Sequence, residues 1–339
     1  MAEQFDKLPP DAFKRVKVNN THAEQIARPS LNFWQDAWLR LRKNKAAVVS
    51  IVVLFLMIVL ALVGPHINSH GLDDQNVSKA NLPPKISWLA PLGIADGHAT
   101  VGGKDVDVYA QKNVTENYWF GTDSLGRDLF TRVWKGTQIS LLIALVAALV
   151  DVLIGVAYGG ISAYYGGKVD DIMQRIVEIL AGIPNLIVVI LMLMVMEPGI
   201  TAIIIAISLT GWIGMSRIVR GQVLKYKNQE FVLASRTLGA SNSRIIFKHL
   251  LPNILAIIII NTMFTVPSAI FFEAFLSFIG LGLQAPNASL GTLINDGYKM
   301  LQFQPYLLAI PAAILSVLMI AFNLIGDGLR DALDPKMKD

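Results

Sequence analysis

The sequence predicts an all-α integral membrane protein with six transmembrane helices. Hydrophobic residues make up 53% of its 339 residues and charged residues only 16%, whereas a soluble domain carries about 25% charged residues. The mean hydropathy is +0.51. Long runs with few or no charges recur along the chain, and a helix of about 20 such residues crosses the hydrocarbon core of a bilayer.

Six apolar runs define the predicted spans. The first, Ala46 to Pro65, contains no charged residue, and the second contains only Asp151. The predicted spans cover residues 46–65, 138–163, 179–196, 199–214, 251–272 and 307–324. Because their number is even, both termini are expected on the same side of the membrane.

Basic residues predict which side that is. Most of the 29 Lys and Arg residues lie before the first span, in the loop 217–250, or near the C-terminus. Basic residues gather in short cytoplasmic segments, so both termini are predicted to be cytoplasmic. The first 45 residues lack a cleavable signal pattern, and the first span is expected to be a retained anchor. This distribution explains the net charge of +4 without a nucleic-acid partner.

Two segments outside the spans have an expected structure. Phe33, Trp34, Trp38 and Leu41 share one face of a predicted amphipathic helix, which we expect in the inner interface of the bilayer, with a cytosolic helix as the alternative. The loop 66–136 is long enough for a small strand-rich subdomain. The predicted organisation is a disordered tail 1–28, an interfacial helix 29–45, a first span 46–65, an external loop 66–136, a core 137–326 with cytoplasmic loop 217–250, and a tail 327–339.

A polar stretch, "EFVLASRTLGASNSRIIFKHLLPN" from Glu230 to Asn253, separates two of the apolar runs. Its first part places Phe231, Ala234, Ser235 and Leu238 at i, i+3, i+4 and i+7, on one face of a short helix. Gly239 stands where a helix end favours a left-handed residue, and Ser241 can cap a second helix. A short surface helix with small residues can fit a groove of another protein. The pattern favours a docking element.

This stretch resembles the cytoplasmic signature of permease subunits of binding-protein-dependent ABC importers. Ala234, Gly239 and the Leu-Pro pair at 251–252 match it, whereas Leu233 and Ser235 replace the usual Glu and second Ala. Glu230, one turn earlier, is a candidate substitute for the missing acid; the alternative is a solvated Glu. The resemblance implies a coupling helix that fits a cleft of an ATPase subunit, with candidate residues Glu230, Phe231, Leu233, Ala234, Ser235, Leu238, Gly239, Ile246, Leu251 and Pro252.

Four further stretches extend the resemblance over nearly the whole chain, and it is closest to the oligopeptide-importer permease of the C type. They are "FGTDSLGRDLFTRVWKG", "YGGISAYYGGKVDDIMQRIVEIL", "FFEAFLSFIGLGLQ" and "NLIGDGLRDALDPK". The resemblance implies the ABC type I importer permease fold in a bacterial inner membrane. It also implies a second permease subunit, an extracytoplasmic peptide-binding protein and two ATP-binding subunits, which hold ATP and Mg²⁺; no cofactor is expected in this chain.

Isolated acidic residues are the candidates for a translocation path. Asp151 lies in the middle of a span, where a carboxylate is unfavourable unless it faces water or protein. We expect it on the path or against the partner subunit, with burial against Ser, Gly or backbone as the alternative. Glu273 lies beside Gly280 and Gly282, which suggest a broken segment. It is a candidate for the outer gate; the alternative is a carboxylate that reaches the interface.

Charged residues near the ends of the spans have simpler interpretations. Asp123, Arg127 and Asp128 are expected to pair locally where the second span begins, although contact with a peptide or its delivery protein is the alternative. Asp170, Asp171, Arg175 and Glu178 are expected to form interfacial ion pairs. Pro184 is expected to kink the third span.

Several functions are excluded by what the sequence lacks. It has no Cys, hence no thiolate metal site, and no Gly-rich loop followed by Lys-Ser/Thr that would bind phosphate. His66 and His70 lack a third metal ligand, so no metal site is expected. The sequence therefore predicts an oligopeptide importer subunit without catalysis of its own. The alternatives are import of dipeptides, glutathione, nickel or antimicrobial peptides, an ATP-independent transporter, and an intramembrane enzyme.

Overall fold

The structure, a computed structural model, describes residues 32–68, 70–101, 103–197, 199–284 and 287–333. The predicted tail 1–28 lies outside the described residues, as does 334–339. The helices and strands are α1 Phe33–Lys43, α2 Lys45–Val63, η1 Gly64–His66, η2 Val77–Lys79, η3 Ala90–Leu92, β1 His98–Val101, β2 Lys104–Asp107, α3 Val108–Gln111, α4 Leu129–Tyr165, α5 Gly167–Ala181, α6 Asn185–Val195, α7 Ile200–Tyr226, α8 Glu230–Thr237, α9 Asn242–Arg244, a π-helix η4 Ile245–Leu250, α10 Leu251–Phe278, α11 Leu290–Lys299 and α12 Tyr306–Leu333.

Five helical segments of the described chain are long and apolar enough to cross a membrane, and a bent pair makes a sixth if it counts as one span. The five are Lys45–His66, α4, α7, Asn242–Phe278 and α12. The pair is α5 with α6, and it bends by 81°. The predicted class, a mostly helical membrane protein with six spans, is therefore confirmed if the bent pair counts as one span. The third span was predicted at 179–196 with a kink at Pro184; the structure instead has two separate helices, α5 and α6, with Pro184 at the N-cap of α6.

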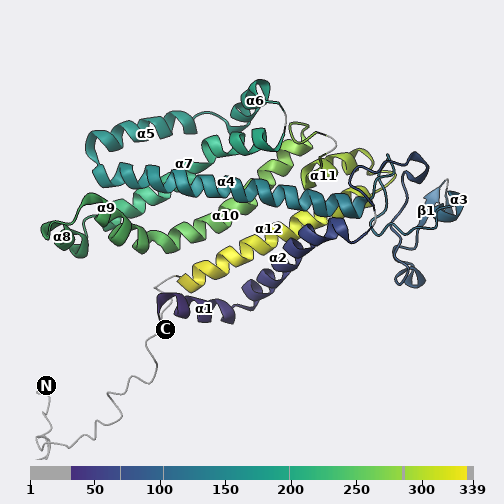
Figure 1. Cartoon of the computed structure of the whole chain (residues 1–339), viewed down its shortest axis with the longest axis horizontal. Helices are drawn as coiled ribbons and strands as arrows, with labels where there is room; N and C mark the ends of the chain where they lie inside the picture. The colour runs from purple at the N-terminus through teal and green to yellow at the C-terminus, as the bar shows by residue number, and fades with distance from the viewer. Residues whose placement is uncertain (1–31, 69, 102, 198, 285–286, 334–339) are drawn as a thin grey trace, which may run out of the picture.

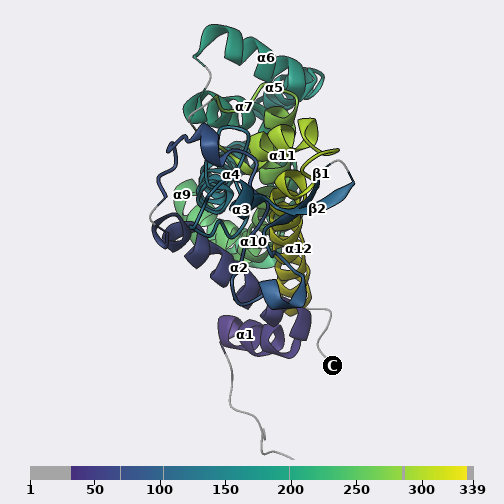
Figure 2. The same ribbon diagram turned by 90° about the vertical axis from the view of Figure 1, so that its right-hand side faces the viewer.

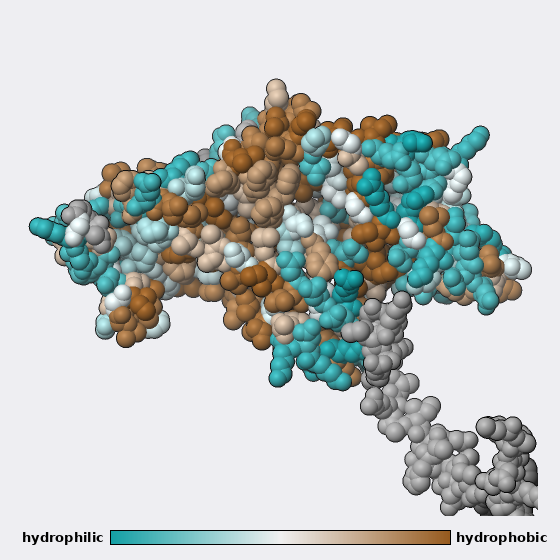
Figure 3. Space-filling view, turned by 180° about the vertical axis from the view of Figure 1, so that it is seen from behind, coloured by the Kyte–Doolittle hydropathy of each residue, from teal (hydrophilic) through white to brown (hydrophobic). Residues whose placement is uncertain are grey.

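The long helices form an elongated bundle, and short elements lie at both of its ends (Figure 1). The "loop end" carries β1, β2 and α3, and the opposite "α8 end" carries α8 and α9. Figure 2, viewed from the loop end, shows α5 and α6 on one flank of the bundle and α1 on the other. Figure 3 shows a hydrophobic band around the middle with hydrophilic surface toward both ends. This distribution suits a membrane slab, because apolar surface faces lipid and polar ends face water.

Several helices are longer than the predicted spans. α4 begins at Leu129, so the external loop ends earlier than 136. α7 continues to Tyr226, which leaves a shorter connection than the predicted loop 217–250. α12 continues to Leu333, so residues 327–333 belong to a helix and not to a tail. The physical reason is that a helix can continue past the hydrocarbon core into water. Charged residues are tolerated in that part of the helix, so the apolar run ends before the helix does.

α4 and α7 pack closely through two glycines four residues apart. A Cβ at Gly155 would lie 2.7 Å from the Cβ of Met215, and one at Gly159 would overlap the Ser216 backbone. Small residues at this spacing let two membrane helices approach closely. The shared apolar core of α4, α7, α10, α11 and α12 includes Ile143, Ile203, Ile270 and Leu318, which are fully buried.

α1 lies beside α2 and the end of α12 (Figure 1). Leu41 is buried against Ala47 and Ala332, whereas Phe33, Trp34 and Trp38 are about half exposed. The four residues predicted on one face therefore have two environments: Leu41 packs on protein, and the three aromatic residues are exposed. The exposed aromatic rings suit the membrane interface.

The external loop is not strand-rich in the described residues. Its one sheet pairs β1 with β2, antiparallel, in the register His98 with Asp107. A small core of Leu82, Val108, Tyr109 and Tyr118 fixes the loop. The Tyr306 hydroxyl donates to the carbonyl oxygens of Leu82 and Thr122, at 2.9 and 3.0 Å, and so joins the loop to the start of α12.

Candidate functional site

The α8 end carries a helix–turn–helix element. α8 ends in a Schellman turn: Gly239 N–H donates to the Arg236 carbonyl, and Ala240 N–H donates to the Ser235 carbonyl, both at 3.0 Å. Gly239 has φ +80°, the left-handed conformation that its position predicts. Ser241 Oγ then accepts from the Arg244 N–H at 3.4 Å and caps α9, also as predicted.

Apolar residues anchor this element on the bundle. Val232 of α8 and Ile245 and Leu250 of η4 are buried in one cluster with residues of α4, α7 and α10. Tyr164, at the end of α4, donates its hydroxyl to Asn242 Oδ1 at 2.7 Å. α8 is therefore packed, through one buried cluster, against the ends of three membrane helices.

The opposite side of the element is open. Phe231, Leu233 and Leu238 are exposed by 40%, 44% and 88% of their surface. Exposed apolar side chains gathered on one short element are typical of an interaction surface. The remaining candidates lie around them: Ala234, Gly239 and Pro252 are exposed, Ser235, Ile246 and Leu251 are half-buried, and Glu230 is exposed without an ion pair in the described chain.

A buried ion pair beside this element was missed at the sequence level. Arg220 of α7 donates from Nε and Nη2 to the two oxygens of Asp170 in α5, each at 2.7 Å. Ser162 of α4 donates to the same carboxylate at 2.5 Å. The expected interfacial pair is confirmed only between Arg175 and Glu178, at 2.7 Å on the surface. Asp170 instead ties α5 to α7 and α4, a long-range pairing that no local spacing reveals.

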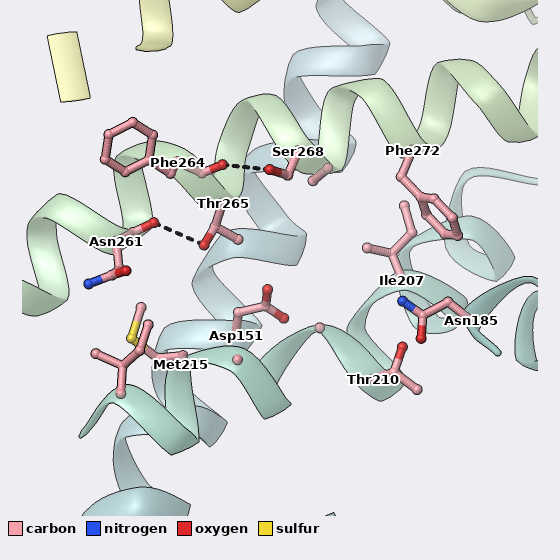
Figure 4. A pocket seen from close by; sticks show the side chains of 14 residues that line it. Asp151, Asn185, Ile207, Thr210, Met215, Asn261, Phe264, Thr265, Ser268 and Phe272 are labelled. Carbon is pink, nitrogen blue, oxygen red and sulfur yellow. Dashed lines mark hydrogen bonds between the residues drawn. The ribbon is translucent and has the colours of Figure 1, made fainter. Parts of the chain in front are cut away.

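A polar pocket opens in the membrane part of the bundle between α4, α7 and α10 (Figure 4). It encloses about 430 Å³. Its polar lining residues are Asp151, Asn185, Thr210, Asn261, Thr265 and Ser268. Asn261, Thr265 and Ser268 recur at i, i+4 and i+7, so a polar stripe in an apolar run was the signal that could have found them.

Asp151 points into this pocket (Figure 4). The residue is only 4% exposed, and its Oδ1 has no hydrogen-bond partner in the described chain. A Cβ at Gly211 would lie 2.5 Å from that oxygen, so the glycine makes room for the carboxylate. Asp151 thus meets the geometric condition for a residue on a polar path.

Glu273 lies elsewhere. It is fully buried, and Ser140 and Ser277 donate to its two oxygens at 2.8 Å each. It does not line the pocket. Its complete burial excludes a carboxylate that reaches the interface, and its place at the outer gate stays a prediction. The hydroxyls that surround it link α4 with α10. Its predicted neighbour, the break after α10, is present, since Gly280 has φ +87° and α11 packs back on α10.

The three charged residues before α4 are also buried. Arg127 donates to Asp123 at 2.7 Å, Arg132 pairs with the same carboxylate, and Asp128 accepts from the Thr131 N–H at 2.9 Å to cap α4. The local pairing is therefore confirmed. External contact is not supported, because Asp123, Arg127 and Asp128 are each exposed by 7% or less.

Comparison with known families decides the class. The model of the family "Binding-protein-dependent transport system inner membrane component" matches residues 152–339. The chain belongs to this family. A second model, the N-terminal TM domain of oligopeptide transport permease C, matches residues 32–84 of this permease.

Relatives of this permease match it over nearly its full length. The dipeptide transport system permease protein DppC of Bacillus subtilis is 47% identical and aligns over 99% of this chain and 96% of its own. The oligopeptide transport system permease protein OppC of the same organism is 44% identical, over 98% and 100%. OppC of Escherichia coli K12 is 40% identical, over 95% and 98%. This permease is therefore a multi-pass inner membrane protein of a transport system.

A solved structure supports the fold. A chain of the MetNI methionine ABC transporter, in an inward-facing conformation, superposes with a TM-score of 0.50 at 21% identity. The match covers 59% of this permease and 96% of that chain. The predicted importer-permease fold is confirmed, and the permease adds to it the segments outside the match.

Proposed function

We propose that this permease is one of two non-identical membrane subunits of an ATP-driven importer of oligopeptides. The observation that carries the proposal is similarity along almost the whole chain, at 44% identity, to a protein named as an oligopeptide permease. The exposed apolar surface of α8 supports it, because a channel or secondary transporter needs no such docking element.

The proposal includes the partners and the orientation. Two ATPase subunits bind ATP and Mg²⁺ and receive α8 in a cleft on the cytoplasmic side, where both termini lie. A peptide-binding protein delivers substrate at the loop end. A second, homologous permease completes the path along the face on which the Asp151 pocket opens.

Transport then follows from a change of state. Closure of the ATPase subunits moves α8, and the buried cluster around Val232, Ile245 and Leu250 carries this displacement into α4, α7 and α10. Coupling requires that ATP and peptide each bind one state of the complex better than the other. Selectivity for peptide side chains resides mainly in the delivery protein.

Dipeptides are the second candidate substrate. The relative DppC of Bacillus subtilis, named for dipeptides, is 47% identical, against 44% for OppC of the same organism. Nickel, glutathione and antimicrobial peptides are further alternatives within the same architecture.

The first experiment measures uptake of a labelled pentapeptide in cells that lack this chain and in cells that regain it. A dipeptide and nickel serve as parallel substrates. We expect pentapeptide uptake to be lost, restored on return of the chain, and abolished by ATP depletion. Unchanged pentapeptide uptake with loss of dipeptide or nickel uptake would contradict the substrate, and uptake that survives ATP depletion would contradict the mechanism.

A second experiment tests the docking surface. Leu238→Glu places a charge at the centre of the exposed apolar group, and we expect uptake to fall about tenfold, as for a central interface residue. Leu238→Met is the matched control, because it keeps an apolar side chain of similar size at the same exposed position. Both variants should reach the membrane in normal amounts. Equal uptake by the two variants would remove α8 as the docking site.

A further inference from the structure

We propose that the pocket between α4, α7 and α10 binds an ammonium group and that the Asp151 carboxylate is its counter-ion. The inference rests on the proposed function, since the ammonium group is then the protonated N-terminus of a peptide or a lysine side chain within it. It adds a substrate subsite inside the membrane subunit, which the peptide would reach after it dissociates from the delivery protein.

The first step in the argument is the state of the carboxylate. Asp151 is 96% removed from solvent, since its relative exposure is 4%, yet it forms no ion pair within the described chain and leaves Oδ1 without a hydrogen bond. A buried acceptor without a partner is unfavourable. Buried acids without partners inside membranes mark ligand or ion sites.

The second step is that the pocket offers hydrogen-bond acceptors. Thr265 and Ser268 donate their hydroxyl protons to backbone carbonyls of α10, at 3.1 and 2.8 Å (Figure 4), and the Asn261 amide donates to the Ile257 carbonyl at 2.8 Å. The hydroxyl donors of Thr265 and Ser268 are therefore used, as is one of the two N–H donors of Asn261, and oxygen lone pairs remain for a ligand. An ammonium group, with three donors and no acceptor, matches such a lining.

The third step is charge and size. No Lys, Arg or His lines the pocket, so within the described chain nothing there neutralises Asp151. Phe264 and Phe272 contribute apolar surface to the lining. The volume of about 430 Å³ falls in the range of small-molecule sites. Exposed Gly214 and Ser268 mark where the pocket opens, so a chain end can enter.

This arrangement has a consequence for specificity. Every unmodified peptide carries an N-terminal ammonium group, so recognition at Asp151 is independent of side-chain sequence. The same carboxylate repels the peptide's C-terminal carboxylate. The site therefore orients the peptide with its N-terminus in the pocket while accepting varied sequences.

The test compares uptake of three pentapeptides: free pentaalanine, its N-acetylated form, and an N-acetylated form with one internal lysine. Each is measured in wild-type cells and in Asp151→Asn cells with the same delivery protein. Because that protein is constant, a change in the ratio of free to acetylated uptake reports on the membrane subunit. We expect Asp151→Asn to lower this ratio about tenfold, the loss of a charged hydrogen bond.

The lysine peptide separates the two sources of ammonium. Uptake of this peptide that depends on Asp151 means that the pocket accepts a side-chain ammonium as well as the N-terminus. Uptake that does not depend on Asp151, together with an altered ratio for free pentaalanine, assigns the site to the N-terminus alone.

Two matched controls isolate the carboxylate. Glu273→Gln also replaces a buried acid by its amide, but outside the pocket, and should leave the ratio unchanged whatever its total uptake. Gly211→Ala displaces the Asp151 carboxylate without removing it, so the ratio should fall. Gly221→Ala, on the same helix but outside the pocket lining and with no atom within 4 Å of an added Cβ, should not change the ratio.

The outcomes are distinct. A ratio that stays at the wild-type value in both Asp151→Asn and Gly211→Ala overturns the inference and leaves the proposed function intact. If Asp151→Asn abolishes all uptake, the comparison of Gly211→Ala with Gly221→Ala decides. Absence of uptake of every peptide in wild-type cells overturns the proposed function and the inference with it.

Discussion

At the residue scale, four buried acids in the described part of this permease have three different environments. Asp123 and Asp170 are each paired with arginine, Glu273 is surrounded by serine hydroxyls, and Asp151 faces a pocket without a partner. Charges buried in a membrane protein persist where they are paired or where they serve a ligand. The contrast separates Asp151 from the structural acids.

The Asp170–Arg220 pair makes a prediction about stability. Arg220→Ala leaves a carboxylate that is 12% exposed with only Ser162, so we expect a loss of about 2 kcal/mol in the free energy of unfolding. Arg175→Ala, on the exposed Glu178 pair, should cost less than about 0.5 kcal/mol. Thermal unfolding of the purified complex in detergent measures both. If both variants lost the same free energy of unfolding, the lower exposure of the Asp170–Arg220 pair would make no difference to stability.

At the element scale, the helix–turn–helix at the α8 end connects the membrane helices with an exposed surface. That surface is accessible to partner proteins. Its turn depends on Gly239, its anchor on Val232 and its cap on Ser241. A π-helix, η4, follows at once and leads into α10. Such helices are frequent at functional sites, where they redirect a helix.

Gly239 provides a prediction at this scale. An added Cβ meets no atom within 4 Å, so any effect of Gly239→Ala comes from the left-handed backbone alone, about 1 kcal/mol. Gly239→Asn should be milder, because Asn visits that conformation more readily. We expect ATP-dependent uptake to fall in the order Gly, Asn, Ala at equal amounts of assembled complex. The reverse order of Asn and Ala would contradict a backbone role.

At the scale of the whole molecule, the bundle separates two polar ends by an apolar band, and this fixes which segments share a side. α8, α9 and the ends of α4 and α7 lie together, and the external loop lies at the other end (Figures 1 and 3). From the distribution of basic residues, we propose that the α8 end is cytoplasmic.

The absence of Cys from the sequence makes this orientation directly testable. Ser243→Cys places a thiol at the exposed α8 end, and Ser87→Cys places one in the exposed part of the external loop. With a membrane-impermeant maleimide, we expect Ser87→Cys to react in intact cells and Ser243→Cys only after the membrane is opened. The opposite pattern would invert the proposed orientation.

The sequence by itself determined the helical membrane class, the apolar runs, the turn at Gly239 and the cap at Ser241. These features depend on composition and on local periodicity, and both can be read from short stretches of sequence. Helix lengths were underestimated because the ends of α7 and α12 lie beyond the hydrocarbon core, where the apolar signal stops. The break at Pro184 was predicted as a kink, since local sequence gives no bend angle.

Only the tertiary structure decided which charged residues meet and which remain alone. Asp170 and Arg220 lie on different helices, and Ser140 reaches Glu273 from a helix far away in sequence. The pocket around Asp151 likewise needs α4, α7 and α10 to assemble its lining. The physical reason is that burial and pairing are properties of packed helices, and the sequence of one helix does not specify which face of another it will meet.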